Sequence, residues 1–262
     1  MKTNYHTHTT WCDGKNSPRQ MVEAALDKKF NELGFSSHAM LPKGTLDWVL
    51  NERSLSEYVK EIHALKMEFK DQIKILCGVE ADYIRGMANP DRGTFAAYQL
   101  DYIIGSVHFV VADDGTPVAV DDTPEILSAG IRDHFDGNVE KYVRAYFEQQ
   151  REMIKGFDFE VIAHPDLVRK FNQRHPFFDE SAPWYREELV KMADAIAASG
   201  KLCEVNTGAI SRGWLDEAYP SASFYELLRA RGVKFILSSD AHSADGLDCA
   251  FDRFGGDKYE EL

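Results

Sequence analysis

Apolar residues recur at three- and four-residue spacing along several stretches of the chain, the pattern of helices with one buried face. In residues 17–30 they occupy positions 21, 22, 25 and 26, after Ser17 as a candidate N-cap and Pro18 at the first helical position. Gly200 and Gly232 follow two other such stretches, as is typical of helix C-termini. We therefore predict helices over residues 17–30, 54–70, 138–157, 184–201 and 223–232.

Short apolar runs separate these helices and predict strands. The runs are rich in β-branched or aromatic residues and do not alternate cleanly, which is typical of parallel strands buried on both faces. They cover residues 4–6, 32–38, 73–80, 101–109, 159–164, 201–206 and 234–240. Because strands alternate with helices, we expect an α/β fold whose parallel sheet closes as a barrel. Residues 1–262 read as one domain, with a hairpin insertion near 110–121 that turns at Asp114-Gly115.

Composition narrows the class of protein. A hydrophobic fraction of 44% predicts a sizeable core, and a net charge of −13 argues against binding to nucleic acid or to an anionic membrane. The four cysteines lie far apart without a C-x-x-C pair, as in reduced intracellular thiols. There is no N-terminal apolar segment and no run of 18 apolar residues, so we expect a cytoplasmic location.

Most of the histidines follow the C-terminal ends of the predicted strands. Together with two carboxylates and an amide, the strand-end residues are His6, His8, His38, Glu80, His108, His164, Asn206, Asp240 and His242. In a parallel barrel the C-terminal strand ends meet at one face, where active sites form. These side chains are scattered in the sequence, but we expect them to be gathered in space.

The gathered side chains suit metal ions. Residues two apart in an extended strand point the same way, so His6 and His8 can face one cation, and so can Asp240 and His242. Glu80, set among imidazoles, can bridge two ions. Imidazole and carboxylate ligands together favour Zn, Mn or Fe, and so many ligands exceed what one tetrahedral ion takes. We therefore expect two or three divalent metals.

Each residue also has a plainer interpretation. A single strand-end histidine such as His38 is more often a hydrogen-bonded core or rim residue, and Asp13 in Cys-Asp-Gly is a common turn residue. We take His63, His134 and His175 as structural or surface residues. Six histidines at the ends of five predicted strands nevertheless favour a common site.

At this point the sequence resembles a known family. The segments HTHT with CDG, GVEADY, GSVHF, AHPDLV and SSDAH are similar to the motif series of the PHP (polymerase and histidinol phosphatase) superfamily, from residue 6 to about 242. The resemblance implies a distorted, TIM-like (β/α)7 barrel with a trinuclear metal centre. It also implies three ligand sets: His6, His8, Glu80 and Asp240; Glu80, His108 and His164; and Asp13, His38 and His242.

Within the superfamily the chain most resembles the histidinol-phosphatase branch. Many PHP proteins have a histidine at the position of Asp13. The resemblance implies that aspartate at this position is the variant found in the histidinol-phosphatase branch. Further signs are LVRKF (167–171) and NTGAISRG (206–213). Cations that follow strand ends can bind phosphate oxygens, and the candidates are Arg212 and either Arg169 or Lys170. Each of them can also be a solvated charge on a loop. Asp82 and Glu204 are candidates for holding a substrate ammonium group.

The resemblance thus implies a metal-dependent phosphomonoesterase of histidine biosynthesis that hydrolyses L-histidinol phosphate to L-histidinol and phosphate. A hydroxide bridging two metals would attack phosphorus, and Asp240 or His242 would assist the leaving alkoxide. The main alternative keeps the site but acts on nucleotides or short oligonucleotides, with Trp11 and Trp214 as stacking platforms. A non-catalytic, metal-stabilised module is a third hypothesis. A small-molecule phosphomonoester is the expected partner, and the sequence leaves the oligomeric state open.

Overall fold

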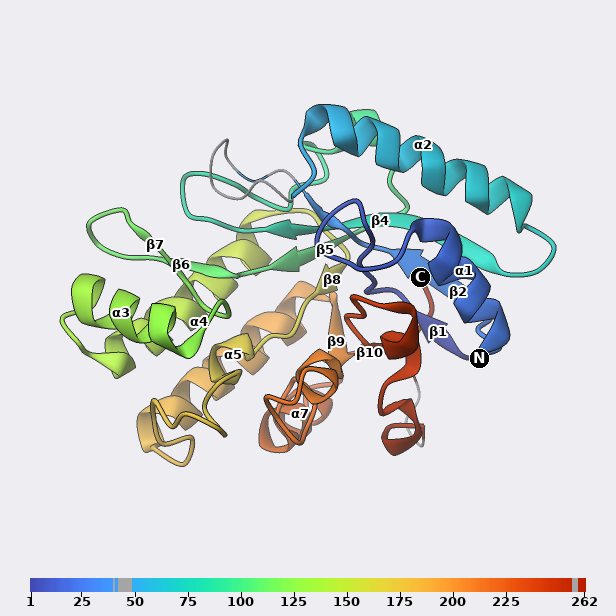
Figure 1. Ribbon diagram of the computed structural model, residues 1–262. Helices are drawn as coiled ribbons and strands as arrows, with labels where there is room; N and C mark the ends of the chain where they lie inside the picture. Colours follow the sequence, from blue (N-terminus) through green and yellow to red (C-terminus); the bar gives the residue numbers. More distant parts are fainter. Residues whose placement is uncertain (40, 42–48, 256–258) are drawn as a thin grey trace.

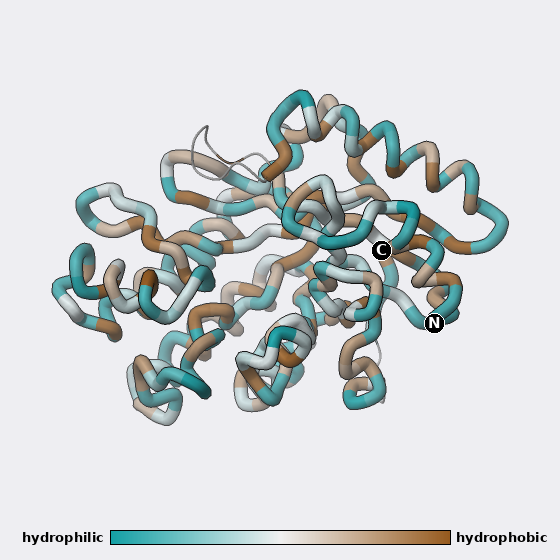
Figure 2. The backbone as a smooth tube through the Cα atoms, viewed as in Figure 1, coloured by the Kyte–Doolittle hydropathy of each residue, from teal (hydrophilic) through white to brown (hydrophobic). Residues whose placement is uncertain are grey.

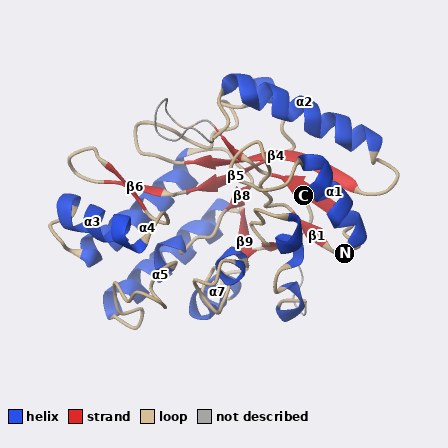
Figure 3. Cartoon of the chain, viewed as in Figure 1, coloured by secondary structure: helices blue, strands red, loops and turns tan. Residues whose placement is uncertain are grey.

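Seven parallel strands form the centre of the molecule. The computed structural model describes residues 1–39, 41, 49–255 and 259–262. In spatial order the strands are β1 (Thr3–Asn4), β2 (Glu32–Phe35), β4 (Lys74–Asp82), β5 (Tyr102–Ser106), β8 (Val161–Ile162), β9 (Leu202–Asn206) and β10 (Phe235–Ser238). Figure 3 shows them together at the centre, with the helices outside. Each predicted strand is present, although most are shorter than expected.

The first and last strands come together and nearly close the barrel. Thr7 and Ala241 form a parallel bridge just beyond the ends of β1 and β10. The amide of Asn4 donates to the Ser239 hydroxyl over 2.6 Å. The predicted TIM-like parallel (β/α)7 barrel is therefore confirmed, with its C-terminal strand ends on one face.

The helices surround this barrel, with α1 and α2 on one side and α4, α5 and α7 on another (Figure 1). Their bounds are α1 (Pro18–Asp27), α2 (Glu52–Glu68), α3 (Pro124–His134), α4 (Val139–Gly156), α5 (Pro183–Ser199), α6 (Gly208–Ser211) and α7 (Ala222–Arg229). Ser17 begins α1 as predicted, in a capping box with Gln20. The helices α3 and α6 were not predicted.

The apolar stripes explain how the helices pack. In α2 the buried residues include Leu55, Tyr58 and Ile62, which lie on the predicted stripe. Figure 2 shows hydrophobic positions alternating with hydrophilic ones along this helix. Gly200 ends α5 in the left-handed conformation, as expected. Gly232 ends the last turn of α7 in the same conformation (φ +74°), and the backbone N–H groups of Gly232 and Val233 donate to the carbonyls of Arg229 and Leu228, as expected.

A separate apolar cluster fills the barrel interior: Tyr5, Leu76, Tyr102, Ile104, Val161, Ala163 and Ile236. The Tyr102 hydroxyl donates to the backbone oxygens of Tyr5 (2.6 Å) and Phe35 (2.9 Å). Gly34 and Gly78 make room for this ring, because a Cβ on either would lie within 2.5 Å of a Tyr102 side-chain atom. The barrel is therefore packed below its mouth, and the polar residues gather above that plug.

Two predicted strands differ from the structure in ways that shape the site. The run 32–38 is interrupted after Phe35, and a short strand β3 (His38–Ala39) follows. The strand β3 keeps the register of β2 on β4, so His38 pairs beside Glu80 in the ladder, and the Glu80 backbone N–H donates to the Ser36 carbonyl between the two strands. The run 101–109 ends at Ser106, so that Phe109 instead begins the next element.

That next element is a two-stranded antiparallel hairpin. β6 (Phe109–Val111) pairs with β7 (Pro117–Ala119) around a turn in which Gly115 has a φ of +87°. The hairpin therefore begins one residue before the predicted segment. Among the described residues, no helix is both long enough and apolar enough to cross a membrane.

Candidate metal centre

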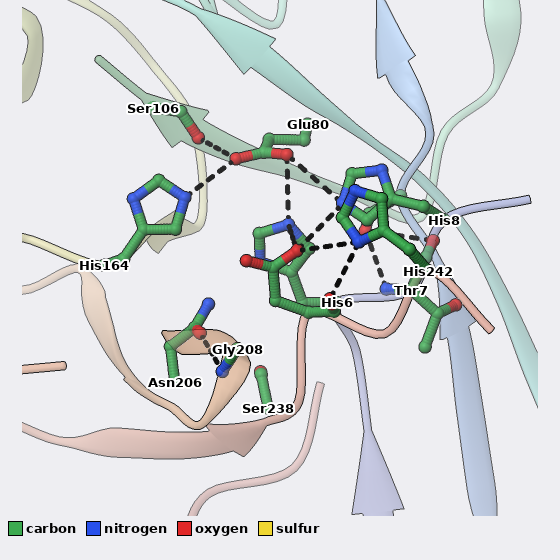
Figure 4. Close-up of polar contacts among 12 residues, drawn as sticks. His6, Thr7, His8, Glu80, Ser106, His164, Asn206, Gly208, Ser238 and His242 are labelled. Carbon is green, nitrogen blue, oxygen red and sulfur yellow. Dashed lines mark hydrogen bonds and ion pairs between the residues drawn. The ribbon is translucent and has the colours of Figure 1, made fainter. Parts of the chain in front are cut away.

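A cavity of about 360 Å³ opens at the C-terminal ends of the strands. Its polar lining contains most of the predicted site residues: Asp13, His38, Glu80, Asp82, His108, His164, Lys170, Arg212, Asp240 and His242. His6 and His8 are fully buried and do not line it. Figure 4 shows both beside Glu80, so the nine predicted metal ligands form one contiguous group.

Glu80 on β4 is the centre of this group. Its Oε2 atom lies close to nitrogens of three imidazoles: His6 (3.0 Å), His38 (3.2 Å) and His8 (3.4 Å). Its Oε1 atom lies 3.1 Å from His164 Nε2, and it accepts a hydrogen bond from Ser106 (Figure 4). One carboxylate therefore faces two sets of nitrogen ligands, which is the arrangement of a bridging ligand.

The nitrogen and oxygen atoms around Glu80 are arranged to bind a cation rather than to form hydrogen bonds with one another. The Nε2 atoms of His6 and His8 are buried, and among the described residues they have no hydrogen-bond partner. Buried polar atoms without partners are rare because each costs about 1–3 kcal/mol. Both nitrogens converge on the Glu80 carboxylate, so a bound divalent ion satisfies all three side chains at once.

The described residues contain several groups whose donor atoms lie within 4.8 Å of one another: His6–His8–Glu80, Glu80–His108–His164, His8–Asp13–His38–His242 and His38–Asp82–His108. The first three follow the ligand sets that the family resemblance implied, with His8 added to the third. Asp240 lies beside the first set, because its Oδ1 is 3.3 Å from His8 Nε2. The fourth set overlaps the others and was not predicted.

Asp13 reaches the centre through a tight turn. Cys12 and Gly14 both donate their backbone N–H to the Thr9 carbonyl, and a Cβ on Gly14 would lie 2.5 Å from the Thr9 nitrogen. Only glycine fits there, so the Asp-Gly pair does form a turn. The same turn places Asp13 Oδ2 3.0 Å from His242 Nε2, and the two interpretations of Asp13 therefore coexist.

Burial and charge act against each other in the centre. Burial alone would lower the pKa of His6, but Glu204, Glu80 and Asp240 outweigh it and raise that pKa well above its usual value. Burial alone would raise the pKa of Glu80, but the imidazoles hold it well below its usual range. Burial, together with the neighbouring imidazoles of His242 and His38, lowers the pKa of His8 to about 3 and favours the neutral ring.

Asp82 lines the cavity and also orients a neighbouring histidine. Its Oδ1 accepts hydrogen bonds from His108 Nδ1 (2.8 Å) and from the His108 backbone N–H (3.0 Å). Burial lowers the pKa of His108, but the carboxylates of Asp82 and Glu80 outweigh it and raise that pKa to about 10. Glu204, the other candidate for a substrate ammonium, is fully buried and does not line the cavity.

Of the three predicted phosphate-binding cations, two line the cavity. Arg212 lies at the end of α6 and donates from Nη2 to Asp240 Oδ2 over 2.6 Å. Lys170 also lines the cavity, where its ammonium donates to the backbone and the carboxylate of Asp121. Burial and the charge of Lys170 act against each other on Asp121, and the net effect lowers its pKa.

Arg169 faces away from the cavity. Its buried guanidinium pairs with Glu180 and Glu217, and it is not among the lining residues. The physical reason is that Leu167–Arg169 form a 3-10 turn, so the adjacent side chains of Arg169 and Lys170 leave it in different directions. Of the two cations between which the sequence left the choice open, only Lys170 lines the cavity, so the expected substrate contact does not fit Arg169.

Several lining residues escaped the sequence prediction. Phe109, Ala119, Asp121 and Asp122 reach the cavity from the ends of the β6–β7 hairpin. The hairpin was visible in the sequence, but nothing in it indicated that its ends bend back to the strand ends. The only available signal was the Asp121-Asp122 pair directly after it.

The two tryptophans considered as stacking platforms lie elsewhere. Trp11 donates its indole N–H to Glu61 over 2.7 Å. Trp214 packs edge-on against Phe171. Neither is among the lining residues of the cavity that the described chain forms, so the nucleotide alternative loses the feature that motivated it.

The remaining histidines have the structural or surface settings expected of them. His63 lies within α2, and His175 packs near Trp214. His134 ends α3, and its ring pairs with Asp114 at the hairpin turn.

Comparison with known proteins identifies the family of the chain. The PHP domain family matches residues 4–208. The chain belongs to the PHP domain family. A probable histidinol-phosphatase of Deinococcus radiodurans is 29% identical over 242 residues, which cover 90% of this chain and 85% of the relative.

Solved structures with a similar fold are also found. A putative histidinol phosphatase of Listeria monocytogenes has a TM-score of 0.85 at 22% identity, over 97% of this chain and all of the other. A histidinol phosphate phosphatase of Lactococcus lactis, solved with zinc, L-histidinol and phosphate, has a TM-score of 0.70 at 26% identity. That alignment covers 100% of this chain and 95% of the Lactococcus chain.

Proposed function

We propose that this PHP protein hydrolyses L-histidinol phosphate to L-histidinol and phosphate in a metal-dependent reaction of histidine biosynthesis. The observation that carries the proposal is the convergence of imidazoles and carboxylates on Glu80, with Arg212 on the same cavity. The Lactococcus relative, solved with zinc, L-histidinol and phosphate, gives the substrate class.

Two to three divalent metals, drawn from Zn, Mn and Fe, complete the site. The ligands are the three sets built on His6 with His8 and Asp240, on His108 with His164, and on Asp13 with His38 and His242, with Glu80 shared between the first two. When bound, such ions lower the pKa of a coordinated water and withdraw charge from phosphate oxygens. The zinc in the Lactococcus structure supports zinc for at least one site.

The chain's own side chains orient the phosphate. Arg212 offers a planar fork of N–H donors at the edge of the cavity and is held there by Asp240. Such a donor stabilises the negative charge on the equatorial oxygens as the bond to the leaving group breaks. Asp240 and His242, which lie together beside Arg212, would assist the departing alkoxide, which takes its proton from water because the pKa of Asp240 is held well below its usual range.

The other end of the substrate carries an amine and an imidazole. Lys170 is already paired with Asp121, and Oδ1 of Asp82 holds His108. The lining carboxylate oxygens that can receive a positive group are then the second oxygen of Asp82 and those of Asp122. Phe109 lies on the same wall and provides an apolar surface. The acidic side of the cavity therefore suits a phosphomonoester that is also a cation.

The four cysteines are free thiols, which supports the expected cytoplasmic location.

A panel of phosphomonoesters tests the proposal. Metal-loaded protein should show its highest kcat/KM on L-histidinol phosphate, compared with uncharged phosphomonoesters, nucleotides and short oligonucleotides. Equal values across the panel would exclude a dedicated histidinol phosphatase. Preference for the nucleotides or oligonucleotides would favour the alternative function of the same site.

A further inference from the structure

Beneath the cavity, Glu204 lies in the middle of β9 and is fully buried. Its Oε1 accepts a hydrogen bond from His6 Nδ1 over 2.7 Å. Its Oε2 accepts one from the His164 backbone N–H (3.1 Å) and another from the Asn206 amide (3.0 Å). A buried carboxylate is costly unless each oxygen is satisfied, and here each is. The reaction proposed above gives Glu204 no role.

The contact with His6 determines which nitrogen carries the proton. Because Glu204 accepts from Nδ1, the proton of the neutral ring lies on that nitrogen and Nε2 keeps its lone pair. Nε2 is the buried atom that faces Glu80 without a hydrogen-bond partner in the described chain. Metal-binding histidines are commonly held by a carboxylate on the opposite ring nitrogen, which fixes the tautomer and the ring orientation.

The second oxygen of Glu204 acts on the other side of the centre. It holds the backbone of His164, whose Nε2 lies 3.1 Å from Glu80 Oε1. His6 approaches the opposite oxygen of Glu80, Oε2. Figure 4 shows the two histidines on different sides of the Glu80 carboxylate. One side chain on β9 thus fixes ligands from two other strand ends and from two different metal sets.

A third contact extends from Glu204 towards the phosphate-binding side. Asn206, held by Glu204, accepts a hydrogen bond from the Gly208 backbone N–H over 2.8 Å (Figure 4). Gly208 has no room for a side chain, because a Cβ there would lie 2.6 Å from Arg212 Nη2 and 2.8 Å from Asp240 Oδ2. Asn206, which Glu204 holds, therefore fixes Gly208, the first residue of the short helix α6, whose C-cap is Arg212.

We infer that Glu204 is a positioning residue that fixes the tautomer of His6 and the place of His164, and thereby sets the metal affinity of the centre. The inference rests on the proposed function only in taking these histidines as metal ligands. It does not depend on which phosphomonoester is the substrate.

The substitution Glu204→Gln is a sharp test because glutamine cannot satisfy all three donors. If its oxygen faces His6, its NH₂ group opposes two N–H donors, those of His164 and Asn206. If the amide is flipped, its NH₂ donates to His6 Nδ1 and moves the imidazole proton to Nε2. That proton then occupies the lone pair that a metal requires.

Metal affinity is measured by zinc competition with a chromophoric chelator, without substrate. Glu204→Gln should bind zinc roughly 10- to 100-fold more weakly than the unsubstituted protein. The matched control is Glu32→Gln, another buried glutamate, which binds Tyr5 and Lys74 away from the cavity. The control should keep the affinity of the unsubstituted protein even if it unfolds more easily.

A spectroscopic readout separates positioning from general stability. Nitrogen-15 NMR of the zinc-loaded protein should show the one remaining His6 ring proton on Nδ1, hydrogen-bonded to Glu204, in the unsubstituted chain, and Glu204→Gln should lose that signature. Should Glu204→Gln not fold, Glu204→Asp, which keeps the charge but shortens the reach, should still weaken zinc binding.

Equal zinc affinity in the folded Glu204 variant and in Glu32→Gln would overturn the inference. If the unsubstituted protein itself bound no divalent metal, the proposed function would fail instead.

Discussion

At the residue scale, Arg212 and Arg169 show how two similar cations take different roles. Both follow strand ends, but Arg212 lines the cavity against Asp240, whereas Arg169 is buried between Glu180 and Glu217. Only the first can touch a phosphate that sits among the metal ligands.

We therefore predict that Arg212→Met lowers kcat/KM for L-histidinol phosphate by about 100-fold, the effect of removing one preorganised donor to a charged transition state. Steady-state kinetics at a verified metal content measure it. Arg169→Met is the control: it leaves the partly exposed carboxylates of Glu180 and Glu217 without their cation, so it should lower stability but change KM little. A larger rise in KM for Arg169→Met than for Arg212→Met would contradict these assignments.

Individual residues also show where sequence reasoning stops. The rule that active residues follow buried strands identified eight of the nine side chains now gathered around Glu80, because parallel strands end together at the barrel mouth; Asp13, the ninth, came from the family resemblance. The rule could not distinguish Arg169 from Lys170, since the geometry of a short turn determines their directions. Glu204 carried a signal that was not used, namely a charge in the middle of the apolar strand LCEVN.

At the element scale, the helices α4 and α5 are joined by a charged cluster. Glu188 on α5 is nearly fully buried and accepts from Arg144 (2.9 Å) and Arg151 (2.8 Å) of α4, and from Lys191 of its own helix. Burial alone would raise the pKa of Glu188, but Lys191 and Arg151 outweigh it and the pKa is lowered.

Glu188→Gln should therefore lower the free energy of unfolding by about 1–2 kcal/mol at pH 7, because the partly exposed cations limit the loss. Folding lowers the pKa of the Glu188 carboxyl, so this group stabilises the protein fully at a pH above the pKa that a glutamate has in the unfolded chain, about 4.3. The contribution is lost as the pH falls through the lower pKa of the folded chain. The difference between the variants should shrink below about pH 4. Urea unfolding across pH 3.5–7 measures it, and a difference that grew with acid would contradict the account.

The elements also differ in how well the sequence predicts them. The apolar stripe of α2 and the capping box of α1 are local, so both helices were predicted within a few residues. The break between β2 and β3 was not, because it depends on contacts that Ser36 makes with Thr7 and Glu80 from distant strands. The helix α3 was not predicted either, although it packs on the hairpin strand β7, which lies just before it in the sequence.

At the scale of the whole molecule, the parallel barrel followed from strand–helix alternation, and its near closure brings the first and last metal-binding segments together. Metal ions bound at this closure should link residues from most strands. They bind the folded chain and have no preformed site in the unfolded one.

Chelation should therefore lower the thermal midpoint. A single site at 100 times its Kd adds about 2.7 kcal/mol to the free energy of unfolding. For a chain of this size that corresponds to a shift of about 5–10 °C. Scanning calorimetry of chelated and zinc-loaded protein measures the difference. An unchanged midpoint in protein shown to lose its metal would contradict a centre that joins the strands.

The most direct test of the central claim is turnover of L-histidinol phosphate by metal-free protein as Zn, Mn or Fe is added back. The account predicts no phosphate release without metal, and recovery of activity that reaches its plateau at two to three ions per chain. Turnover that persisted in the metal-free protein, or a fully loaded protein that left L-histidinol phosphate intact, would contradict it.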